Sequence, residues 1–440
     1  MTVLHFGLTP KMKPVSPRKS AVVAALDIGT SKVVCLVARL APAPPQDVLR
    51  RRSHGVQVMG FGHTAARGMK AGAVVDLVAA EEMIRHAIDS AESRAGVQLE
   101  SVVVSLSGGR LTSELFNASV DLNDSAVRDG DIARVLAATS RHTVREGRAV
   151  LHSLPIGYAL DASRGIRNPR GMVGSRFGVD MHMVTADAAA ARNLMLTVER
   201  SHLEVEAMVA SPYAAGLSAL ADDEADLGAA VVDMGAGTTT IAVFSGGRFI
   251  HADGFALGGQ HVTMDLARGL NARISDAERI KTFYGTVFTG GADDRDMITV
   301  PPVGDDDREP PQFVSRETLV QMIKPRVEEI LEMVRDRLAA SPFAAEPRAR
   351  VLLTGGASQL VGLTELATRV LGRAVRIGRP LGLSGLPESA KGPAFAAAAG
   401  LLIYPQAAHL EHFEPRKTRH LMTGTGGYMA KVGQWLRESF

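Results

Sequence analysis

Two short segments of the chain combine an aspartate with a turn rich in glycine and hydroxyl residues. Asp27 ends the apolar run 21–27 and precedes Ile28-Gly29-Thr30-Ser31. Asp233 ends the run 227–233 and precedes a turn of glycines and threonines. Glycine admits phosphate oxygens to backbone N–H groups because it has no Cβ, and hydroxyl groups add donors. The residues predicted to contact phosphate are Gly29, Thr30, Ser31, Lys32, Gly235, Gly237, Thr238 and Thr239.

The two aspartates would repel a phosphate that they contacted directly. A hydrated Mg²⁺ between carboxylate and phosphate removes this repulsion, so Asp27 and Asp233 are predicted to bind Mg²⁺ through water. One Asp-x-Gly turn is also a common hairpin, and neither segment is specific alone. Two copies about half the chain apart favour a nucleotide site, as does the glycine pair Gly355-Gly356, which follows a predicted strand and opens a predicted helix.

The elements that must hold these turns follow from the residue pattern. Each turn joins two apolar, β-branched runs, so we expect strand–turn–strand units at 21–40 and 227–244 in two related halves that face each other. Helices are predicted at 76–96, 123–147, 187–200, 259–270, 275–284 and 315–340, the last interrupted by Pro325, and from the Gly355-Gly356 turn to Leu371. Further strands are predicted at 55–62, 102–106, 178–185 and 350–354. The uncharged segment 392–410 contains prolines and many alanines and predicts a buried helix rather than a membrane span.

Composition excludes several classes of protein. The 440 residues are 46% hydrophobic and 22% charged, which is typical of a folded globular chain with a large core. Lys and Arg number 49 against 47 Asp and Glu, so bulk charge gives no reason to expect nucleic-acid binding. The single cysteine, Cys35, excludes an intrachain disulfide and suits a reducing cytosol.

Three motifs are similar to those of the actin, Hsp70 and hexokinase superfamily. They are DIGTSK at 27–32, DMGAGTTT at 233–240 and LLTGGASQLVGL at 352–363. Over nearly the whole chain, the sequence further resembles the FtsA family of bacterial cell-division proteins. This resemblance rests on ARGM at 66–69, AERIK at 277–281, VRIGRPLGLSGL at 375–386 and the amphipathic end around 435–437.

The resemblance implies an α/β, actin-like (RNase H-like) fold of two lobes, with ATP and Mg²⁺ in the cleft. A subdomain called 1C is inserted in the first lobe, and the usual subdomain 1B is missing. The implied division is a basic extension at 1–20, subdomain 1A at 21–100 and 186–207, 1C at 101–185, 2A at 208–247 and 327–405, 2B at 248–326, a flexible linker at 406–426 and an amphipathic membrane-targeting helix at 427–440.

The resemblance also assigns the adenosine side of the site. It implies that Glu278 and Lys281 contact the ribose and base, and that Gly355, Gly356 and Ser358 lie beside the adenosine. Glu278 has a structural alternative, because Ser275-Asp276-Ala277-Glu278 also fits a helix capping box in which Glu278 returns to the Ser275 N–H.

The start of the inter-lobe helix departs from the relatives that hydrolyse ATP quickly. Those relatives carry an acidic or amide residue before a proline, whereas the segment here is Ala210-Ser211-Pro212, with Ser211 predicted as N-cap and Pro212 as first helical residue. Serine without a partner is not a general base at neutral pH. We therefore expect weak ATPase activity at most, with no confident catalytic residue beyond the Mg²⁺-associated aspartates.

The last fourteen residues predict an amphipathic helix at the end of a polar linker. Its apolar stripe carries the only tryptophan of the chain, and the segment 414–440 has five Lys or Arg against two Glu. Such a helix fits an in-plane membrane anchor, and the alternative is a terminal helix packed on the protein's own core. The stripe residues are Tyr428, Val432, Trp435, Leu436 and Phe440.

The resemblance implies a protein that tethers filaments of the tubulin-like FtsZ to the cytoplasmic face of the inner membrane at the division septum. It also implies self-association into filaments and binding of the FtsZ C-terminal peptide on 2B, where Arg326 and Glu329 are candidate contacts. The alternatives are an actin-like pilus or shape protein and a carbohydrate kinase of the same superfamily. A chaperone of the Hsp70 type is disfavoured, because too few residues follow Pro405 for a peptide-binding domain.

Overall fold

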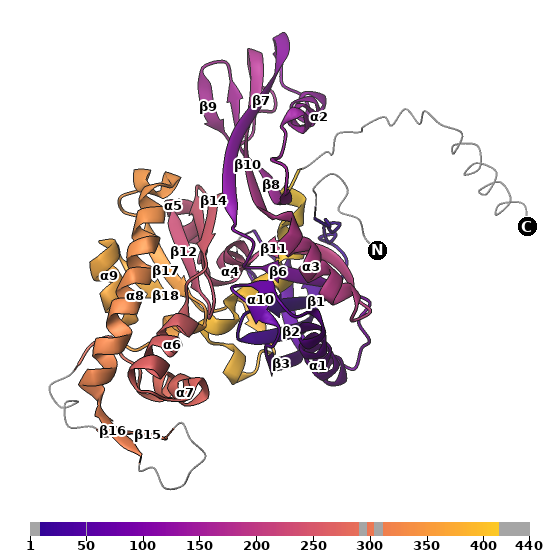
Figure 1. Ribbon diagram of the computed structural model, residues 1–440. Helices are drawn as coiled ribbons and strands as arrows, with labels where there is room; N and C mark the ends of the chain where they lie inside the picture. Colours follow the sequence, from indigo (N-terminus) through magenta and orange to yellow (C-terminus); the bar gives the residue numbers. More distant parts are fainter. Residues whose placement is uncertain (1–8, 50, 290–296, 303–310, 413–440) are drawn as a thin grey trace, which may run out of the picture.

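The computed structural model describes residues 9–49, 51–289, 297–302 and 311–412. Its described part has two lobes side by side, and a smaller β-rich unit stands on the first lobe (Figure 1). Each lobe is built around one mixed sheet with helices packed against it. The apolar runs of the sequence supply the buried strands of these sheets.

The sheet of the first lobe has the order β11-β6-β1-β2-β3-β19. Strands β1, β2 and β3 form an antiparallel meander. Strands β6 and β11 add in parallel on the other side of β1. The strands are β1 (Ala21–Ile28), β2 (Lys32–Pro42), β3 (His54–Ala65), β6 (Ser101–Leu106), β11 (Glu204–Ala210) and the short β19 (Leu383–Ser384). Helices α1 (Leu77–Ala95) and α10 (Ala396–Ala407) pack on this sheet, and α3 (Ala188–Glu199) packs beside α1.

The sheet of the second lobe, β14-β13-β12-β17-β18, repeats the same plan. Its strands are β12 (Ala229–Met234), β13 (Thr239–Ser245), β14 (Arg248–Phe255), β17 (Arg350–Thr354) and β18 (Val375–Ile377). The register repeats as well, because Asp27 pairs with Val34 and Asp233 pairs with Thr240, each seven residues further along. The expectation of two related halves is confirmed.

A third sheet, β7-β10-β8-β9, forms the β-rich unit above the first lobe (Figure 1). It consists of β7 (Thr112–Ala126), β8 (Arg148–Leu160), β9 (Ser163–Ile166) and β10 (Val173–Asp187), with α2 (Asp129–Ala138) packed on it. Phe177 and Met181 are fully buried in a small core of its own. The prediction of one helix over 123–147 is wrong at both ends, because residues 123–126 complete β7 and the helix stops at Ala138 before a short 3-10 turn.

The remaining helices cover the second lobe or lie between the lobes. They are α4 (Ser211–Ala219), α5 (Asp222–Leu227), α6 (Gly259–Gly269), α7 (Ile274–Tyr284), α8 (Arg316–Ala339) and α9 (Leu363–Leu371). Two small ribbons, β4 (Met69–Lys70) with β5 (Ala73–Val74) and β15 (Met297–Val300) with β16 (Gln312–Ser315), complete the described elements.

Two helix predictions are corrected by packing. Pro325 does not interrupt α8, which is continuous and buries apolar side chains on both sides of the proline, among them Ile323 and Val327. This burial outweighs the hydrogen bond that the proline removes. The segment after Gly355 is not one helix, because a 3-10 turn at Gly356–Gln359 is separated from α9 by Gly362 in a left-handed conformation.

Helix α10 is buried along its whole length, as the sequence predicts, but it covers only part of the predicted 392–410, because 3-10 turns flank it and residues 409 and 410 are exposed. Within the described ranges, no helix has both the length and the apolar character needed to cross a bilayer. The predicted membrane-targeting helix and all but the first seven residues of the predicted linker lie outside the described residues.

Candidate functional site

The two aspartate-glycine turns have the same geometry. In the first, the Gly29 N–H donates to the Lys32 carbonyl at 2.9 Å, and in the second the Gly235 N–H donates to the Thr238 carbonyl at 2.9 Å. A Cβ added at either glycine would lie about 3 Å from that carbonyl, at 3.1 and 3.0 Å. Both positions therefore favour glycine, because only glycine lets the turn close this tightly.

The turns come from different lobes and face each other directly. A Cβ on Gly237 would lie 2.5 Å from the Thr30 hydroxyl oxygen, so the Gly237 backbone lies against the Thr30 side chain across the lobes. The Thr30 hydroxyl also accepts from the Gly72 N–H at 3.0 Å. The tertiary structure thus brings together the two segments that the sequence places about half the chain apart.

The aspartates form a partly buried acidic pair with the charge of Lys32 nearby. Burial and the neighbouring Asp27 raise the pKa of Asp233 to about 7, although Lys32 and Ser211 act in the opposite direction. Burial also raises the pKa of Asp27. The Lys32 amine lies 3.8 Å from the centre of the Phe395 ring and donates to the Ala394 carbonyl. The pair favours a cation, because a positive charge between the carboxylates lowers the cost of ionising both.

Two serines hold the aspartates in place, and the sequence singled out neither for this role. The Ser105 hydroxyl donates to Asp27 at 2.5 Å from the neighbouring parallel strand β6. Ser211 is hydrogen-bonded to Asp233. The prediction that Ser211 caps its helix is wrong, because Ala210 is the N-cap and the Ser211 hydroxyl is directed to the carboxylate instead. The only sequence signal for Ser105 is that it lies on a predicted strand, and the structure places this strand beside β1.

The third glycine motif lies against the second aspartate. Gly355 has φ +86°, and a Cβ there would lie 2.5 Å from an Asp233 carboxylate oxygen. The Gly355 N–H donates to the Pro393 carbonyl at 3.0 Å. Ser358 is buried, and its hydroxyl donates to the Gly355 carbonyl at 2.8 Å. Gly356, in contrast, faces open space.

Glu278 and Lys281 form an ion pair that reaches the same region. The Lys281 amine lies 2.7 Å from the Glu278 carboxylate and donates to the Gly259 carbonyl at 3.1 Å and the Thr263 hydroxyl at 2.8 Å. A Cβ on Gly259 would lie 3.0 Å from the Cβ of Ala357, so this corner adjoins the third glycine motif. The capping-box alternative for Glu278 is wrong, because α7 begins at Ile274 with Arg273 as its N-cap.

The hydroxyls of the turns are placed differently from one another. Thr239 is buried, and its hydroxyl donates to the Leu257 carbonyl at 2.8 Å, whereas Ser31 is exposed and its carbonyl accepts from the Ala66 N–H at 2.9 Å. Thr238 is buried behind the second turn. Among the described residues, no group of three or more His, Cys, Asp or Glu side chains could hold a metal ion. A cation at the aspartate pair would therefore depend on water or ligand oxygens.

The candidate partner residues lie on α8, away from the turns. Arg326 donates to Asp265 at 2.6 Å and is also paired with Glu329. These contacts raise the pKa of Arg326. Its guanidinium is therefore already engaged by two carboxylates. The five predicted membrane-facing residues, Tyr428, Val432, Trp435, Leu436 and Phe440, lie outside the described residues.

Comparison with known families and sequences identifies close relatives. Residues 230–400 match the model of the family "Cell division protein FtsA", and residues 108–185 match the "SHS2 domain inserted in FTSA". The cell division protein FtsA of Agrobacterium fabrum is 52% identical, with 99% of this chain and 98% of that protein covered. The FtsA of Escherichia coli is 34% identical, with 95% and 98% covered.

Comparison with solved structures identifies the fold. The PilM-PilN type IV pilus biogenesis complex matches with a TM-score of 0.59 at 18% identity, covering 87% of this chain and 98% of that chain. MreB5 of Spiroplasma citri bound to ADP matches with a TM-score of 0.51 at 13% identity, covering 89% and 98%. The expected actin-like two-lobed fold with an insertion in the first lobe is confirmed.

Proposed function

The chain belongs to the FtsA family of cell division proteins, and we propose from this premise that it binds ATP and Mg²⁺ between its two aspartate-glycine turns. The observation that carries the proposal is the contact of the two turns across the lobes, with a partly buried carboxylate pair beside them. Asp27 and Asp233 would hold Mg²⁺ through water. The backbone N–H groups and hydroxyls of residues 29–32 and 235–239 would bind the phosphates.

The adenosine would lie between the third glycine motif and the ion pair on α7. Gly356 faces open space and Gly355 lies against Asp233, so ribose and base on this side would continue the line of the phosphates. Glu278 carries free lone pairs beyond its contact with Lys281, and a carboxylate of this kind suits ribose hydroxyls. A bound ADP in the MreB5 structure supports a nucleotide for this fold.

ATP hydrolysis is proposed to be slow. The residue at the start of the inter-lobe helix is Ser211, a buried serine, and a serine hydroxyl is not a general base that activates water at neutral pH. A turnover as fast as that of a sugar kinase, retained in Ser211→Ala, would contradict this part of the proposal.

We propose the subdomain division given above with two boundaries moved. Subdomain 1C begins after Leu106 rather than at residue 101, because Ser101–Leu106 pairs with β1 and β11 in the sheet of the first lobe. The match of residues 108–185 to the inserted domain supports this moved boundary. The proposed linker begins after Leu410 rather than at residue 406, because α10 runs to Ala407 and a 3-10 turn follows at Ala408–Leu410.

In the cell, the protein is proposed to anchor FtsZ filaments to the cytoplasmic face of the inner membrane at the septum and to form filaments of its own. Family membership supports this role, and the amphipathic pattern of 427–440 supports the membrane anchor. Arg326 and Glu329 remain the proposed contacts for the FtsZ peptide. To bind it, Arg326 must replace its hydrogen bond to Asp265 with a contact to the peptide.

Liposome co-sedimentation tests the anchor. The full chain and a chain ending at Gly426 are compared on anionic liposomes, each with and without ATP and FtsZ. We expect the full chain to sediment with lipid, to bring FtsZ with it, and to bind more strongly with ATP because assembly multiplies the anchors.

A matched pair of variants distinguishes membrane binding through the apolar stripe from binding that depends only on the charge of the helix. Trp435→Glu places a carboxylate on the stripe, and Gln434→Glu places the same charge beside it. We expect the first to abolish sedimentation and the second to reduce it slightly. Equal binding by the truncated and full chains would show that the anchor assignment is wrong.

A further inference from the structure

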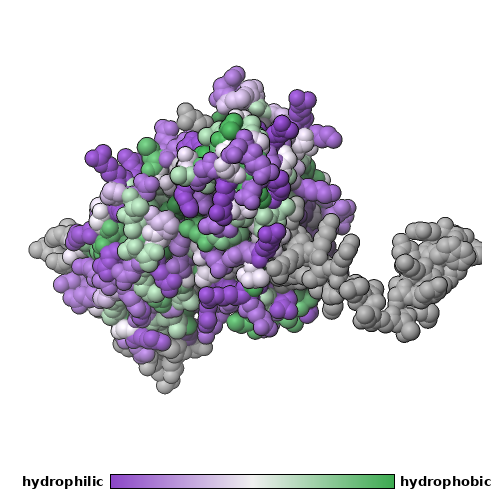
Figure 2. All heavy atoms as spheres, turned by 90° about the horizontal axis from the view of Figure 1, so that it is seen from above, coloured by the Kyte–Doolittle hydropathy of each residue, from purple (hydrophilic) through white to green (hydrophobic). Residues whose placement is uncertain are grey.

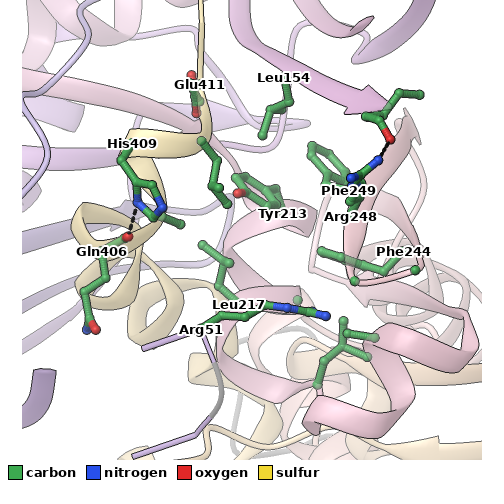
Figure 3. A pocket seen from close by; sticks show the side chains of 18 of the residues that line it. Arg51, Leu154, Tyr213, Leu217, Phe244, Arg248, Phe249, Gln406, His409 and Glu411 are labelled. Carbon is green, nitrogen blue, oxygen red and sulfur yellow. Dashed lines mark hydrogen bonds between the residues drawn. The ribbon is translucent and has the colours of Figure 1, made fainter. Parts of the chain in front are cut away.

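A cavity of about 680 Å³ lies where β8, α4, the β13–β14 hairpin and the end of α10 meet (Figure 3). This volume is typical of a site that binds a ligand or a few large side chains. Tyr213, Phe244 and Phe249 line it with side chains that are at most 5% exposed, and Leu154 and Leu217 also line it. The rings of Tyr213 and Phe249 are stacked with their centres 4.4 Å apart. None of these residues belongs to the nucleotide site proposed above.

The chain leaves its described part at the edge of this cavity. Leu410, Glu411 and His412 line it, and Figure 3 shows Glu411 and His409 along one side. Glu411 is held there by the His152 ring at 2.7 Å, by the Lys11 amine at 2.9 Å and by the Tyr404 hydroxyl at 2.8 Å. The starting point of the C-terminal segment is therefore fixed beside the cavity.

The length of the remaining chain lets its apolar stripe return to the cavity. About 15 residues separate His412 from Tyr428, and they span up to about 50 Å when extended. A tether of this length gives a local concentration in the millimolar range. An apolar helix stripe kept free in water at such a concentration would be drawn to a nearby aromatic cavity.

The charges at the mouth of the cavity complement one residue of the tail. Arg167 is exposed, and burial, together with the positive charge of Arg167, lowers the pKa of Arg248, whose guanidinium also donates to the Ile156 carbonyl. Both guanidiniums line the cavity. In the helix that the spacing of 427–440 predicts, Glu438 follows Trp435 by one turn and would lie on the same side as the indole.

We propose that this cavity holds the apolar stripe of residues 427–440 when no membrane is available, with the Trp435 indole against Tyr213 and Phe249 and Glu438 facing Arg167 and Arg248. This inference rests on the proposed membrane anchor. Lipid and cavity then compete for the same side chains, so the docked tail shields an apolar helix in the cytoplasm and weakens membrane binding by single molecules.

Tryptophan fluorescence tests the proposal, because Trp435 is the only tryptophan of the chain. Emission and acrylamide quenching are measured for the full chain without lipid and for the isolated peptide 427–440 in the same buffer. We expect blue-shifted emission and weaker quenching in the full chain. Leu410→Asp puts a charge into the cavity at a side chain that is 46% exposed, so the fold should tolerate it. Val78→Asp, at a residue that is 67% exposed on α1, is the matched control.

Leu410→Asp should shift the emission to that of the peptide and raise liposome affinity roughly three- to ten-fold, because the docked state no longer competes. Val78→Asp should change neither. Arg167→Glu should also expose the indole, and Arg167→Glu combined with Glu438→Arg should restore the shift. Peptide-like emission of the unmodified chain, or a shift that neither cavity variant changes, would overturn the proposal while liposome binding still reports on the anchor. A blue shift that vanishes on dilution would also overturn it, because the occupant would then be the tail of a second copy.

Discussion

At the scale of single residues, the aspartate pair is the most unusual feature of the molecule. Two partly buried carboxylates lie near one lysine, and the pKa of Asp233 is raised to about 7. Burying like charges is costly unless a cation joins them. The cost supports the proposed role of these residues in cation binding rather than a role in stability.

The first prediction is that Asp233→Asn stabilises the nucleotide-free protein in a pH-dependent way. The folded pKa of Asp233 lies above its unfolded value, so its ionisation destabilises the native state increasingly as the pH rises from about 4 to about 7. The variant should gain on the order of 2–4 kcal/mol over the unmodified protein at pH 8 and close to nothing at pH 4. Urea unfolding at the two pH values measures this gain.

Mg²⁺ with ATP should reverse the order at pH 8, stabilising the unmodified protein and not the variant. An equal effect of Asp233→Asn at both pH values would contradict a raised pKa.

The second prediction concerns two neighbouring glycines with different surroundings. Gly355 has a left-handed φ and no room for a Cβ beside Asp233, whereas Gly356 faces open space with an ordinary φ. Gly355→Ala should destabilise the fold by at least about 1–3 kcal/mol and abolish ATP binding, because the Asp233 carboxylate must move. Thermal unfolding and titration with a fluorescent ATP analogue measure both effects. Gly356→Ala is the control and should retain its stability, so a similar loss there would argue against the steric explanation.

At the scale of elements, α4 connects the nucleotide site to the start of the C-terminal segment. Ser211 at its N-terminus is bonded to Asp233, and the preceding Ala210 N–H donates to the His152 ring at 2.9 Å. Because His152 Nε2 accepts this bond, Nδ1 carries the proton and donates to Glu411. The N-terminal segment joins the same group through Lys11.

The third prediction is that this group fastens both ends of the described chain. Glu411 is nearly buried, and its partners Lys11 and His152 lower its pKa to about 2. Its contribution to stability is therefore present above pH 4.5 and is lost as the pH falls from 4.5 toward 2. Glu411→Gln should cost about 3–5 kcal/mol at pH 7, since it removes the carboxylate that pairs with Lys11 and leaves that amine only the Leu151 carbonyl. Protease cleavage after Lys11 and Lys13 should become faster.

The surface pair Lys391–Glu388 offers a control for charge alone, because Glu388 is 88% exposed. Glu388→Gln should change the free energy of unfolding by less than about 1 kcal/mol. If Glu411→Gln and Glu388→Gln changed the free energy of unfolding equally, the group around Glu411 would not fasten the ends of the described chain.

At the scale of the whole molecule, three large sheets and the helices packed on them form the two lobes and the inserted unit. In Figure 1 the inserted unit stands above the lobes, and in Figure 2 hydrophilic side chains cover much of the face seen from above, with hydrophobic atoms visible near its middle. The lobes touch at Thr30 and Gly237, so nucleotide binding must separate the turns slightly. The relative position of the lobes should therefore depend on the ligand.

The fourth prediction uses a cross-link between the lobes. A Cβ on Gly237 would lie 3.0 Å from the Cβ of Thr30, slightly under the 3.5–4.5 Å that a disulfide prefers. The double variant Thr30→Cys with Gly237→Cys should cross-link on mild oxidation without nucleotide and do so at least about ten-fold more slowly with Mg²⁺ and ATP. Electrophoretic mobility without reductant measures the closed loop. Cys35 does not interfere, because it is buried and its pKa is raised to about 12.

Each single cysteine variant serves as a control and should form no intramolecular cross-link. Cross-linking that is equally fast with and without ATP would place the nucleotide elsewhere.

The sequence by itself determined the repeated strand–turn–strand units, their aspartates and the buried helix near residue 400. These follow from local rules, because apolar alternation, glycine turns and β-branched runs restrict the backbone whatever surrounds them. The Asp76 N-cap and the left-handed Gly96 C-cap, at the two ends of α1, also depend only on the local sequence. The family could be identified from short sequence motifs, because only proteins with this particular site require them.

The tertiary structure alone decided which partner each polar group found. Ser105 reaches Asp27 only because β6 lies beside β1, and Glu278 bonds Lys281 and Thr263 rather than its own helix start. Pro325 is tolerated because the core of the second lobe holds α8 straight. The strands of the inserted sheet pair across long sequence separations, and the cavity beside Glu411 exists only where four distant segments meet. Pairings of this kind depend on distances in space, which residue order does not specify.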